Sequence, residues 1–249
     1  VIICKWYVLF IIFTICTTYG STIWIDKLLK KQNAIVKSHK EDWDRQTRKE
    51  YKEKGRKKRV AVMLFALLCN FSILAFLKYI PYAGELGLLL PLGISFYTFQ
   101  SMGYVMDVYR EIVEPEKNFL KVALFVSFFP QIIQGPIAIY DKLAGQLYEG
   151  HSLRLENLQK GALLVLWGVM KKLVIADRAV NIINFVMDKP MDFSGTYVFF
   201  AAVVYALQLY ADFSGGIDIV RGIAEMFGIT MSTNFNHPYF SRSLTEYWH

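Results

Sequence analysis

Residues 197–220 read YVFFAAVVYALQLYADFSGGIDIV, and this stretch decides the fold class. It begins as an apolar run typical of a membrane-spanning helix, and it then places Asp212 and Asp218 on either side of Gly215-Gly216. A carboxylate at bilayer depth is costly unless it faces the protein interior or a water-filled cavity. A helix break at the two glycines would also free backbone groups that lipid cannot satisfy. We therefore expect a broken helix that lines a polar site inside a membrane protein. A loop that starts at Asp212 on the membrane surface is the alternative.

Long apolar runs recur through the chain. Hydrophobic residues make up 54% of the sequence, compared with about 45–50% in an average soluble domain by a similar count. The excess is concentrated at residues 2–25, 60–80, 119–139 and 161–187. Each of these runs is close to the roughly 20 residues that a helix needs to cross a bilayer. This pattern predicts an all-α, polytopic membrane helix bundle with broken or re-entrant helices.

The two ends of the sequence indicate a fragment. The chain begins with Val1 inside an apolar run, and it ends at Trp248-His249 without a helix stop. The first run is too long for a signal peptide and has no small-residue cleavage pattern. We expect a single membrane domain over residues 1–249, incomplete at both ends. Its expected parts are a spanning helix at 1–25, a basic loop at 26–59 and a core at 60–249.

The positive charge of the chain is concentrated in residues 26–59. This segment has 14 Lys and Arg against 6 Asp and Glu, a net charge of +8, while the whole chain carries +7. An excess of Lys and Arg in a short segment between spanning helices marks the cytoplasmic side of a membrane, and it favours contact with anionic headgroups. We therefore expect a cytoplasmic loop with a surface helix. Membrane lipids are its expected partner rather than nucleic acid, because the segment has no recognisable nucleic-acid-binding fold.

Two runs combine polar residues with helix breakers. Pro91 and Gly93 are expected to kink or break a helix. Gln131 and Gln134 lie three residues apart, hence on one helical face, and prolines at positions 130 and 136 flank them. This second pattern predicts a broken or re-entrant segment that lines a cavity, and an ordinary kinked helix is the alternative.

The last third of the chain contains charged residues in apolar surroundings. Lys171-Lys172 interrupts the run at 161–187, and we expect these lysines either to extend to the membrane interface or to face a hydrated funnel. Beyond residue 218 the sequence predicts a short amphipathic helix that ends at Gly228. Ser243 and Glu246 fit a capping box that begins another helix.

The residues alone do not identify a catalytic site. No phosphate-binding glycine loop, nucleophile elbow or zinc-protease motif is recognisable. The three cysteines have no metal-ligand spacing, so we expect no metal and no tightly bound cofactor. His39 and His151 fit solvated positions, and His237, which precedes a proline, fits a structural turn.

Five segments together resemble the membrane-bound O-acyltransferase (MBOAT) family, specifically its bacterial alginate O-acetylase-like branch. They occur in the order and spacing of the family. The segments are PLGISFYTFQSMGYVMDVYR at 91–110, FVSFFPQIIQGPI at 125–137, LLVLWGVMKKLVIADR at 163–178, YALQLYADFSGGIDI at 205–219 and NFNHPYFSRSLTEYWH at 234–249. Each is short, but five in register make the resemblance specific.

The resemblance implies a multi-pass enzyme of the bacterial plasma membrane. Such an enzyme moves an acyl group, most often acetyl in this branch, from a cytoplasmic thioester donor to an acceptor at the outer face. The implied donor is acetyl-CoA or an acyl carrier, and the implied acceptor is an exported polysaccharide. An extracytoplasmic acyltransferase is a further implied partner. This chemistry needs a base near the acceptor hydroxyl, and an imidazole suits it because its pKa lies near neutral pH.

The histidines that the family uses are expected beyond the last residue of this sequence. Glu246-Tyr247-Trp248 matches the family pattern E-[FY]-W, so His249 takes the variable position that follows, and the R-W-H histidine would come three residues later. The catalytic residues are therefore unknown, and the fragment by itself is expected to be inactive. The candidates for lining the tunnel and contacting substrate are Gln134, Gln208, Asp212, Ser214 and Asn236.

Three alternatives to polysaccharide acetylation stay open at the level of sequence. Within the family, the runner-up is the transfer of D-alanine to teichoic acid from a carrier protein. A transporter would also have broken helices and buried polar groups, although no internal repeat is visible. The third alternative is a non-catalytic membrane scaffold that keeps the fold of the family.

Overall fold

The computed structural model describes residues 7–39, 42–79, 91, 93–135, 139–235 and 238–248, and within these ranges the chain forms helices and no strand. This agrees with the predicted all-α class. The chain divides into two compact units. The first comprises Val1–Ile132 and Ile137–Tyr148, and the second comprises Ile133–Pro136 and Glu149–His249. Asn236, His237 and His249 lie outside the described residues, and the single-domain assignment stays a prediction.

The first unit is built on a hairpin of two long helices, α1 (Val8–Ser38) and α2 (Arg45–Tyr79). Both helices continue past their apolar runs into the basic segment, and they leave only the short connection at 39–44. The prediction of a basic loop over 26–59 was therefore wrong, because its Lys- and Arg-rich sequence propagates the helices instead of interrupting them. Its helical character was predicted correctly, but as the ends of the two long helices.

Small and polar residues hold this hairpin together. The buried face of α1 includes Thr14, Thr18 and Thr22, whose short side chains allow a close helix contact. Thr18 and Thr22 donate their hydroxyls to backbone carbonyls four residues earlier, at 2.6 and 2.9 Å. Asn70 of α2 donates its amide to the hydroxyl of Thr17 across the hairpin, at 3.0 Å. These hydroxyls and the amide nitrogen of Asn70 therefore have partners within the helices that they join.

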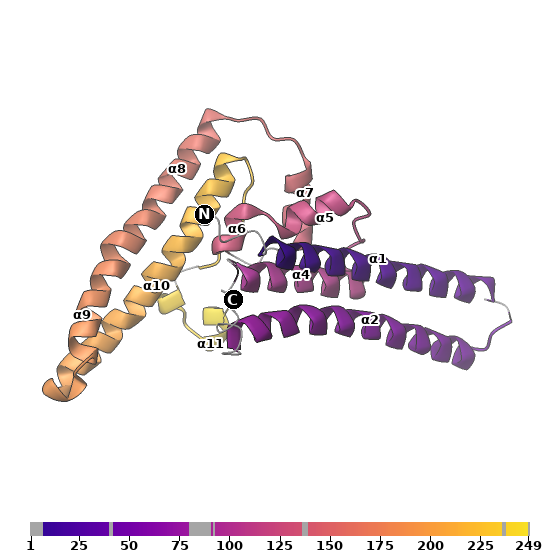
Figure 1. Ribbon diagram of the computed structural model, residues 1–249, viewed down its shortest axis with the longest axis horizontal. Coiled ribbons are helices and arrows are strands. Elements are labelled where there is room, and N and C mark those ends of the chain that lie inside the picture. Colours follow the sequence, from indigo (N-terminus) through magenta and orange to yellow (C-terminus); the bar gives the residue numbers. More distant parts are fainter. Residues whose placement is uncertain are drawn as a thin grey trace. The chain divides into compact units, whose positions relative to one another are not determined.

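Helix α4 (Ile94–Tyr109) packs against both α1 and α2, and the three lie side by side in Figure 1. Helix α4 begins immediately after Gly93, as a helix breaker there predicts, while residues 80–90 and 92 lie outside the described residues. This glycine has a φ of 74°, which residues with a Cβ rarely adopt. A Cβ at Gly93 would also overlap the backbone oxygen of Ile132.

The segment that contains the two glutamines is broken, as the first alternative predicted. Helix α5 (Phe119–Val126) is capped by Ser127, and the short α6 (Phe129–Ile133) follows. Helix α7 (Tyr140–Tyr148) closes the first unit. The amide of Gln100 on α4 donates to the carbonyl of Phe125 at 3.0 Å, so a buried polar side chain satisfies the carbonyl at the broken end of α5.

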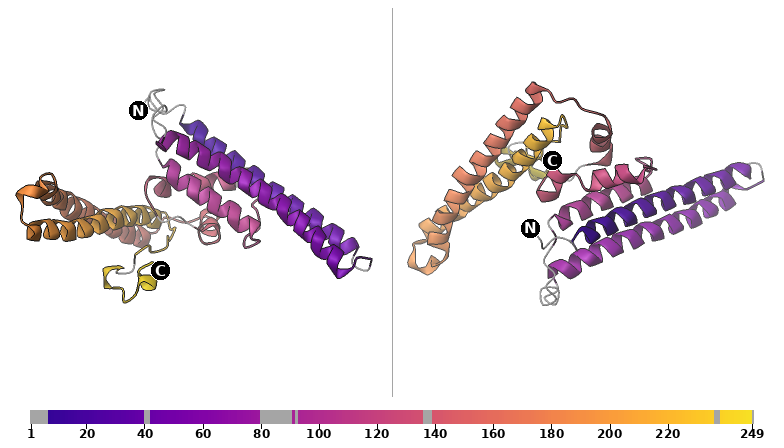
Figure 2. Two further views of the ribbon diagram at one scale, coloured as in Figure 1. Left: turned by 90° about the horizontal axis from the view of Figure 1, so that it is seen from below. Right: turned by 45° about the horizontal axis from the view of Figure 1, so that its top comes forward.

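The second unit is an antiparallel helical hairpin (Figures 1 and 2). One arm is continuous from α8 (Leu155–Val169) through a π-helical segment (Met170–Ala176) into α9 (Asp177–Met187). The other arm is α10 (Gly195–Met226), a single helix of 32 residues. The predicted break at Gly215-Gly216 was therefore wrong, and so were the surface loop at Asp212 and a separate helix beyond residue 218. The predicted helix end at Gly228 is confirmed.

The glycines of α10 serve close packing instead. Gly161 and Gly168 of α8 face Gly222 and Gly215 of α10, and these four residues form what we call the glycine seam. A Cβ on Gly168 would lie 2.5 Å from the backbone oxygen of Gly215, and a Cβ on Gly161 would lie equally close to that of Gly222. Small residues allow membrane helices to approach at this distance. The glycine seam therefore sets the separation of the two arms.

The end of α10 and the start of the last helix follow local rules. Gly228 has a φ of 78°, and its amide and that of Ile229 donate to the carbonyls of Glu225 and Ala224, which is a Schellman motif. Helix α11 (Leu244–Trp248) begins with one half of the predicted capping box, because the amide of Glu246 donates to the hydroxyl of Ser243 at 3.1 Å. The carboxylate of Glu246 accepts from the amide of Arg242 at 2.7 Å instead of from that of Ser243.

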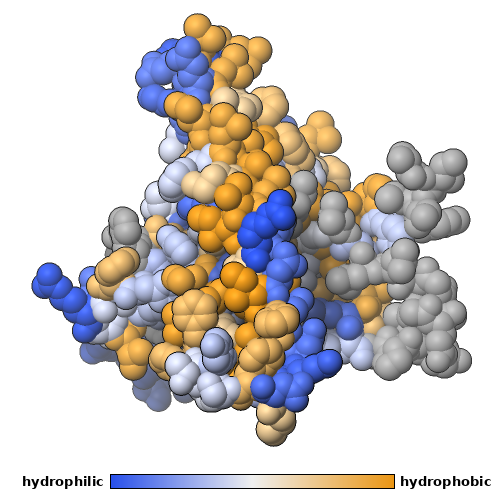
Figure 3. Space-filling view, turned by 90° about the vertical axis from the view of Figure 1, so that its left-hand side faces the viewer, coloured by the Kyte–Doolittle hydropathy of each residue, from blue (hydrophilic) through white to orange (hydrophobic). Residues whose placement is uncertain are grey.

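Much of the helical surface is apolar, as a membrane protein requires. Among the described residues, three helices are long and apolar enough to cross a bilayer, namely α1, α2 and α10. Large apolar side chains such as Leu163, Trp167 and Phe199 are exposed on α8 and α10, and Figure 3 shows apolar side chains over much of one face. The exposed side chains and the long apolar helices together identify the protein as a membrane protein.

We expect the variant Gly168→Ala to lower the free energy of unfolding by about 1–3 kcal/mol, because the added methyl group meets backbone and forces the helices apart. Gly103→Ala on α4 is the matched control, since nothing lies within 4 Å of its Cβ position. Thermal unfolding of the purified variants in detergent measures both effects. Equal stabilities of the two variants would contradict the seam.

Candidate functional site

A cluster of charged side chains lies where the π-helical segment packs against α10. Lys171 forms the centre of its inner part. The ammonium of Lys171 is 2.6 Å from a carboxylate oxygen of Asp218 and 3.4 Å from the hydroxyl of Ser214. The guanidinium of Arg221 is 3.3 Å from the other oxygen of Asp218. One carboxylate therefore joins two cations and accepts a hydrogen bond from each.

The outer part of the cluster is the ion pair between Lys172 and Asp212. These side chains are 43% and 39% exposed, whereas Lys171 and Asp218 are 15% and 12% exposed. This difference in exposure decides how much each ion pair contributes to the free energy of unfolding. An exposed pair typically contributes about 0–1 kcal/mol, whereas removing one partner of a buried pair costs about 3–5 kcal/mol.

The π-helical segment explains how two consecutive lysines reach the same neighbouring helix. The amide of Asp177 donates to the carbonyl of Lys172, five residues earlier instead of four. Such a turn is wider than an α-helical turn, and it often occurs at functional sites. Asp212 and Asp218 lie six residues apart, about 9 Å along α10, so the flexible lysine side chains extend in different directions to meet them.

The glycine seam brings the cluster together. Gly168 lies one turn before the two lysines, and Gly215 follows Ser214 directly. The Cβ of Lys171 lies close to Gly215, 3.1 Å from the position that a Cβ would take there. The close approach of the helices therefore shortens the path that the lysine side chains must bridge.

Gln134 joins the same part of α10. A Cβ on Gly216 would overlap the amide of Gln134, so this glycine allows Gln134 to lie directly on the helix. The pair of glycines thus makes two contacts, with α8 through Gly215 and with Gln134 through Gly216. Neither contact requires the helix to break.

The structure brings together three of the five predicted site residues, namely Gln134, Asp212 and Ser214. Gln208 lies one helical turn before Asp212 on α10 and is half-buried. Asn236 falls outside the described residues, so its place stays a prediction. The roles of all five in binding substrate also stay predictions.

Sequence reasoning missed the partners of these residues. The lysines at 171 and 172 were expected to extend to the membrane interface or to face a hydrated funnel, but both form ion pairs with α10. Arg221 was not considered. The signal was present, because charges in membrane helices usually pair with one another, and the two arms carry opposite charges in corresponding runs.

A pocket of about 370 Å³ lies beside the cluster. Its walls are aromatic and come from α10 and from the segment that follows it. The lining residues are Leu209, Tyr210, Phe213, Asn234, Phe235, Pro238, Tyr239 and Tyr247. The hydroxyl of Tyr239 donates to the carbonyl of Ala206 at 2.7 Å and fixes this segment on the helix. The ring of Tyr210 lies 6.0 Å from the ammonium of Lys171, so the pocket and the cluster share a wall.

The site combines an apolar wall with three cations and two carboxylates, an excess of one positive charge. This arrangement is suited to binding and orienting a polar or anionic group next to an apolar one. The two histidines in the described ranges, His39 and His151, lie elsewhere. His39 stacks on Trp43, and His151 lies beside Gly228. The described part of the site therefore contains no imidazole.

No family model matches the chain. Individual proteins do. This chain is 32% identical over 224 residues to the peptidoglycan O-acetyltransferase of Helicobacter pylori, and the alignment covers 75% of this chain and 42% of that protein. It is 37% identical over 163 residues to the probable alginate O-acetylase AlgI of Azotobacter vinelandii, and this alignment covers 65% of this chain and 32% of that protein. It is 25% identical over 163 residues to the teichoic acid D-alanyltransferase of Bacillus subtilis, and this alignment covers 63% of this chain and 40% of that protein.

These similarities confirm the resemblance to the membrane-bound O-acyltransferases that the five motifs indicated. The chain spans between 32% and 42% of the length of these three relatives. The two O-acetyltransferases are more similar to the chain than the D-alanyltransferase is.

We expect Asp218→Asn to destabilise the protein by about 3–5 kcal/mol, because it leaves Lys171 and Arg221 beside each other without their shared anion. Asp212→Asn is the matched control on the same helix, with an expected cost of about 1 kcal/mol or less. Unfolding in detergent at one ionic strength measures both. A larger cost for Asp212→Asn would reverse the assignment of inner and outer pairs.

Proposed function

Because its similarity to membrane-bound O-acetyltransferases extends over most of the chain, we propose that this protein acts in the transfer of an acetyl group to an exported cell-surface polysaccharide. The observation that carries the proposal is the 32% identity to a peptidoglycan O-acetyltransferase over 75% of the chain. The probable alginate O-acetylases, at 33–37% identity, support the same class of acceptor. An acyl thioester, either acetyl-CoA or an acyl carrier, is the proposed donor, and an extracytoplasmic acyltransferase is a proposed partner.

The reaction requires an acceptor hydroxyl to attack the thioester carbonyl while a base takes its proton and the thiolate leaves. We assign a positioning role to the charged cluster and the aromatic pocket. The excess positive charge favours the polar part of a donor or acceptor, and the aromatic wall excludes water from it. Asp212 and Gln134 are the residues that we propose orient the acyl donor.

A second candidate function is the transfer of D-alanine to teichoic acid. The 25% identity to two D-alanyltransferases supports it less strongly than the acetyltransferase similarity supports the first. A transporter or a non-catalytic scaffold with the same fold would perform neither transfer. One assay distinguishes these functions. Membranes that contain the full-length protein are incubated with radiolabelled acetyl-CoA and isolated polysaccharide. Labelled acceptor is the expected result, and incorporation of D-alanine alone would support the second candidate. Absence of both transfers would overturn the enzymatic proposal.

We also propose a multi-pass arrangement in the bacterial plasma membrane, with residues 26–59 in the cytoplasm. The net charge of +8 on this segment supports the orientation. In the structure, this charge lies at the helical ends that form one tip of the α1–α2 hairpin. The opposite end of α2, at Tyr79, then lies on the outer side.

Labelling of single cysteines tests this orientation at the two ends of one helical hairpin. In a background without Cys4, Cys16 and Cys69, we expect Tyr79→Cys to react with a membrane-impermeant maleimide in intact cells. Asp42→Cys should react only in inverted membrane vesicles. Both positions are exposed, so burial does not limit either reaction. The opposite labelling pattern would invert the proposed topology.

We expect Asp212→Ala in the full-length protein to insert and fold normally but to lose acetyl transfer by tenfold or more, about the effect of misplacing a positioned substrate. Asp192→Ala, an exposed carboxylate in the turn before α10, is the control and should retain activity. The double variant Lys172→Ala/Asp212→Ala separates two explanations. If Asp212 acts on substrate, the double variant stays inactive. Recovery of transfer would show instead that the unpaired lysine caused the loss.

A further inference from the structure

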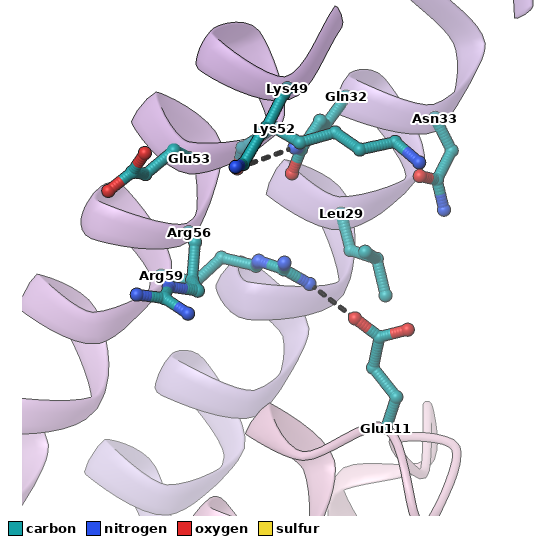
Figure 4. Close-up of a pocket in the computed structure, with 9 residues that line it drawn as sticks. All are labelled: Leu29, Gln32, Asn33, Lys49, Lys52, Glu53, Arg56, Arg59 and Glu111. Atoms are coloured by element: carbon teal, nitrogen blue, oxygen red, sulfur yellow. Dashed lines mark hydrogen bonds and ion pairs between the residues drawn. The ribbon is translucent and has the colours of Figure 1, made fainter. Parts of the chain in front are cut away.

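A basic groove lies at the charged tip of the first unit, and none of the residues assigned to acyl transfer lines it. It has a volume of about 610 Å³ and runs between α1 and α2, with Glu111 at one end (Figure 4). Leu29, Gln32 and Asn33 line it from α1, and Lys49, Lys52, Glu53, Arg56 and Arg59 line it from α2. Four cations and two carboxylates give it an excess of two positive charges. Its volume lies in the range of small-molecule sites.

The floor of the groove contains a buried arginine whose donors are incompletely used. Arg59 is only 8% exposed. One of its terminal nitrogens lies 2.7 Å from a carboxylate oxygen of Glu111, but its buried Nε has no hydrogen-bond partner in the described part of the chain. A buried donor without a partner costs free energy, and a bound acceptor would remove this cost.

A second buried polar group lies in the same groove. Gln32 is 5% exposed, and its amide nitrogen donates to the carbonyl of Lys52 at 2.9 Å. Gly55 leaves space for this side chain, because a Cβ there would overlap it. The amide oxygen of Gln32 has no partner among the described residues. The groove therefore offers both an unused donor and an unused acceptor.

Glu111 occupies the position after α4 at which a Schellman motif ends the helix, because its amide and that of Ile112 donate to the carbonyls of Val108 and Asp107. Glu111 has a φ of 63°, and it is the one non-glycine residue with a positive φ in the described part of the chain. Glycine normally takes this position after a helix, and a residue with a side chain is strained there. This turn places the carboxylate of Glu111, which is half exposed, beside the guanidinium of Arg59. Strained residues of this kind cluster at ligand sites.

We propose that this groove binds a phosphate group through Arg59, and that the phosphate belongs to an anionic phospholipid. The planar guanidinium matches the geometry of phosphate oxygens. Lys52 and Arg56, which are exposed on the rim, add the positive potential that attracts such a group. The unused oxygen of Gln32 would accept a hydrogen bond from a headgroup hydroxyl or ammonium.

The depth of the groove favours a lipid source. Arg59 is the last charged residue before the apolar run of α2, so it lies at the level where the hydrocarbon ends. Lys49 lies ten residues earlier, about 15 Å further out along the helix. The headgroup layer on each side of a bilayer is roughly 5–8 Å thick. A lipid phosphate therefore lies at the depth of Arg59, while the outer end of the groove remains in water.

Binding of phosphatidylglycerol to the purified full-length protein in neutral detergent tests the proposal, with phosphatidylcholine as the reference lipid. Native mass spectrometry or lipid-induced thermal stabilisation gives the apparent affinity. We expect Arg59→Gln to weaken phosphatidylglycerol binding about tenfold, the usual effect of losing a hydrogen bond to a charged group. Because Arg59→Gln also removes the ion pair to Glu111, the rim variant Lys52→Gln/Arg56→Gln provides a test that leaves the buried residues intact. It should weaken binding by a measurable factor.

The control variant is Lys27→Gln/Lys37→Gln, which removes the same charge from exposed positions of α1 that line neither this groove nor the adjacent pocket that shares Gln32. Its affinity should remain within about twofold of the wild type, since screened surface charges contribute little. If both double variants weaken binding equally, the effect is diffuse attraction and the site is overturned. A parallel titration with inorganic phosphate and a nucleoside bisphosphate identifies the source. Selective, Arg59-dependent binding of these soluble anions without lipid binding would overturn the lipid assignment. The result of the lipid-binding measurement does not depend on acyl transfer. The acyl-transfer activity of the same variants is measured separately.

Discussion

The close approach of α8 and α10 at the glycine seam is the contact on which the second unit depends. Without Cβ atoms at Gly168 and Gly215, backbone meets backbone, and the side chains beside these positions are brought within bonding distance. Lys171 and Lys172 then reach carboxylates that would otherwise be isolated charges in an apolar helix. Unpaired charges in lipid cost a large free energy. The close packing of the two helices avoids this cost, because it allows the charges to pair.

The first unit uses the same principle with different residues. Gly55 allows Gln32 to pack directly on α2, and Gly93 allows the backbone before α4 to meet Ile132. In both units a glycine lies opposite a polar or backbone group that needs a short contact. The helices are therefore positioned by sites where a side chain is missing, and the apolar side chains remain available for the lipid-facing surface.

Much of the helical architecture could be predicted from the sequence, because long apolar runs, caps and breakers act locally. The start of α4 after Gly93, the break between α5 and α6 and the helix cap at Ser243 follow from nearby residues alone. Gly215-Gly216 shows where this reasoning fails. Glycine weakens a helix locally, but it also allows another helix to approach, and the sequence does not state which effect is stronger. Here the tertiary contact with α8 and Gln134 compensates for the weak helix propensity.

The candidate site was predictable in part for a related reason. Asp212, Ser214 and Gln134 could be selected because polar residues stand out in apolar surroundings. The identity of their partners depended on the register between two helices. The π turn shifts that register, and no local sequence pattern in Met170–Ala176 predicts the π turn. Lys171 and Lys172 therefore looked like interface residues, although their charge was the best clue to the carboxylates on α10.

The π turn also limits how the length of this chain can change during evolution. It holds one residue more than a regular α-helical turn, so deleting a single residue would let the backbone return to ordinary α-helical pairing. The same deletion would rotate one side of the helix relative to the other by about 100°. The glycines at 161 and 168 and the packing surface of α9 could then no longer face α10 together. A shortened descendant would keep an intact helix while losing the register between the surfaces that α8 and α9 present to α10.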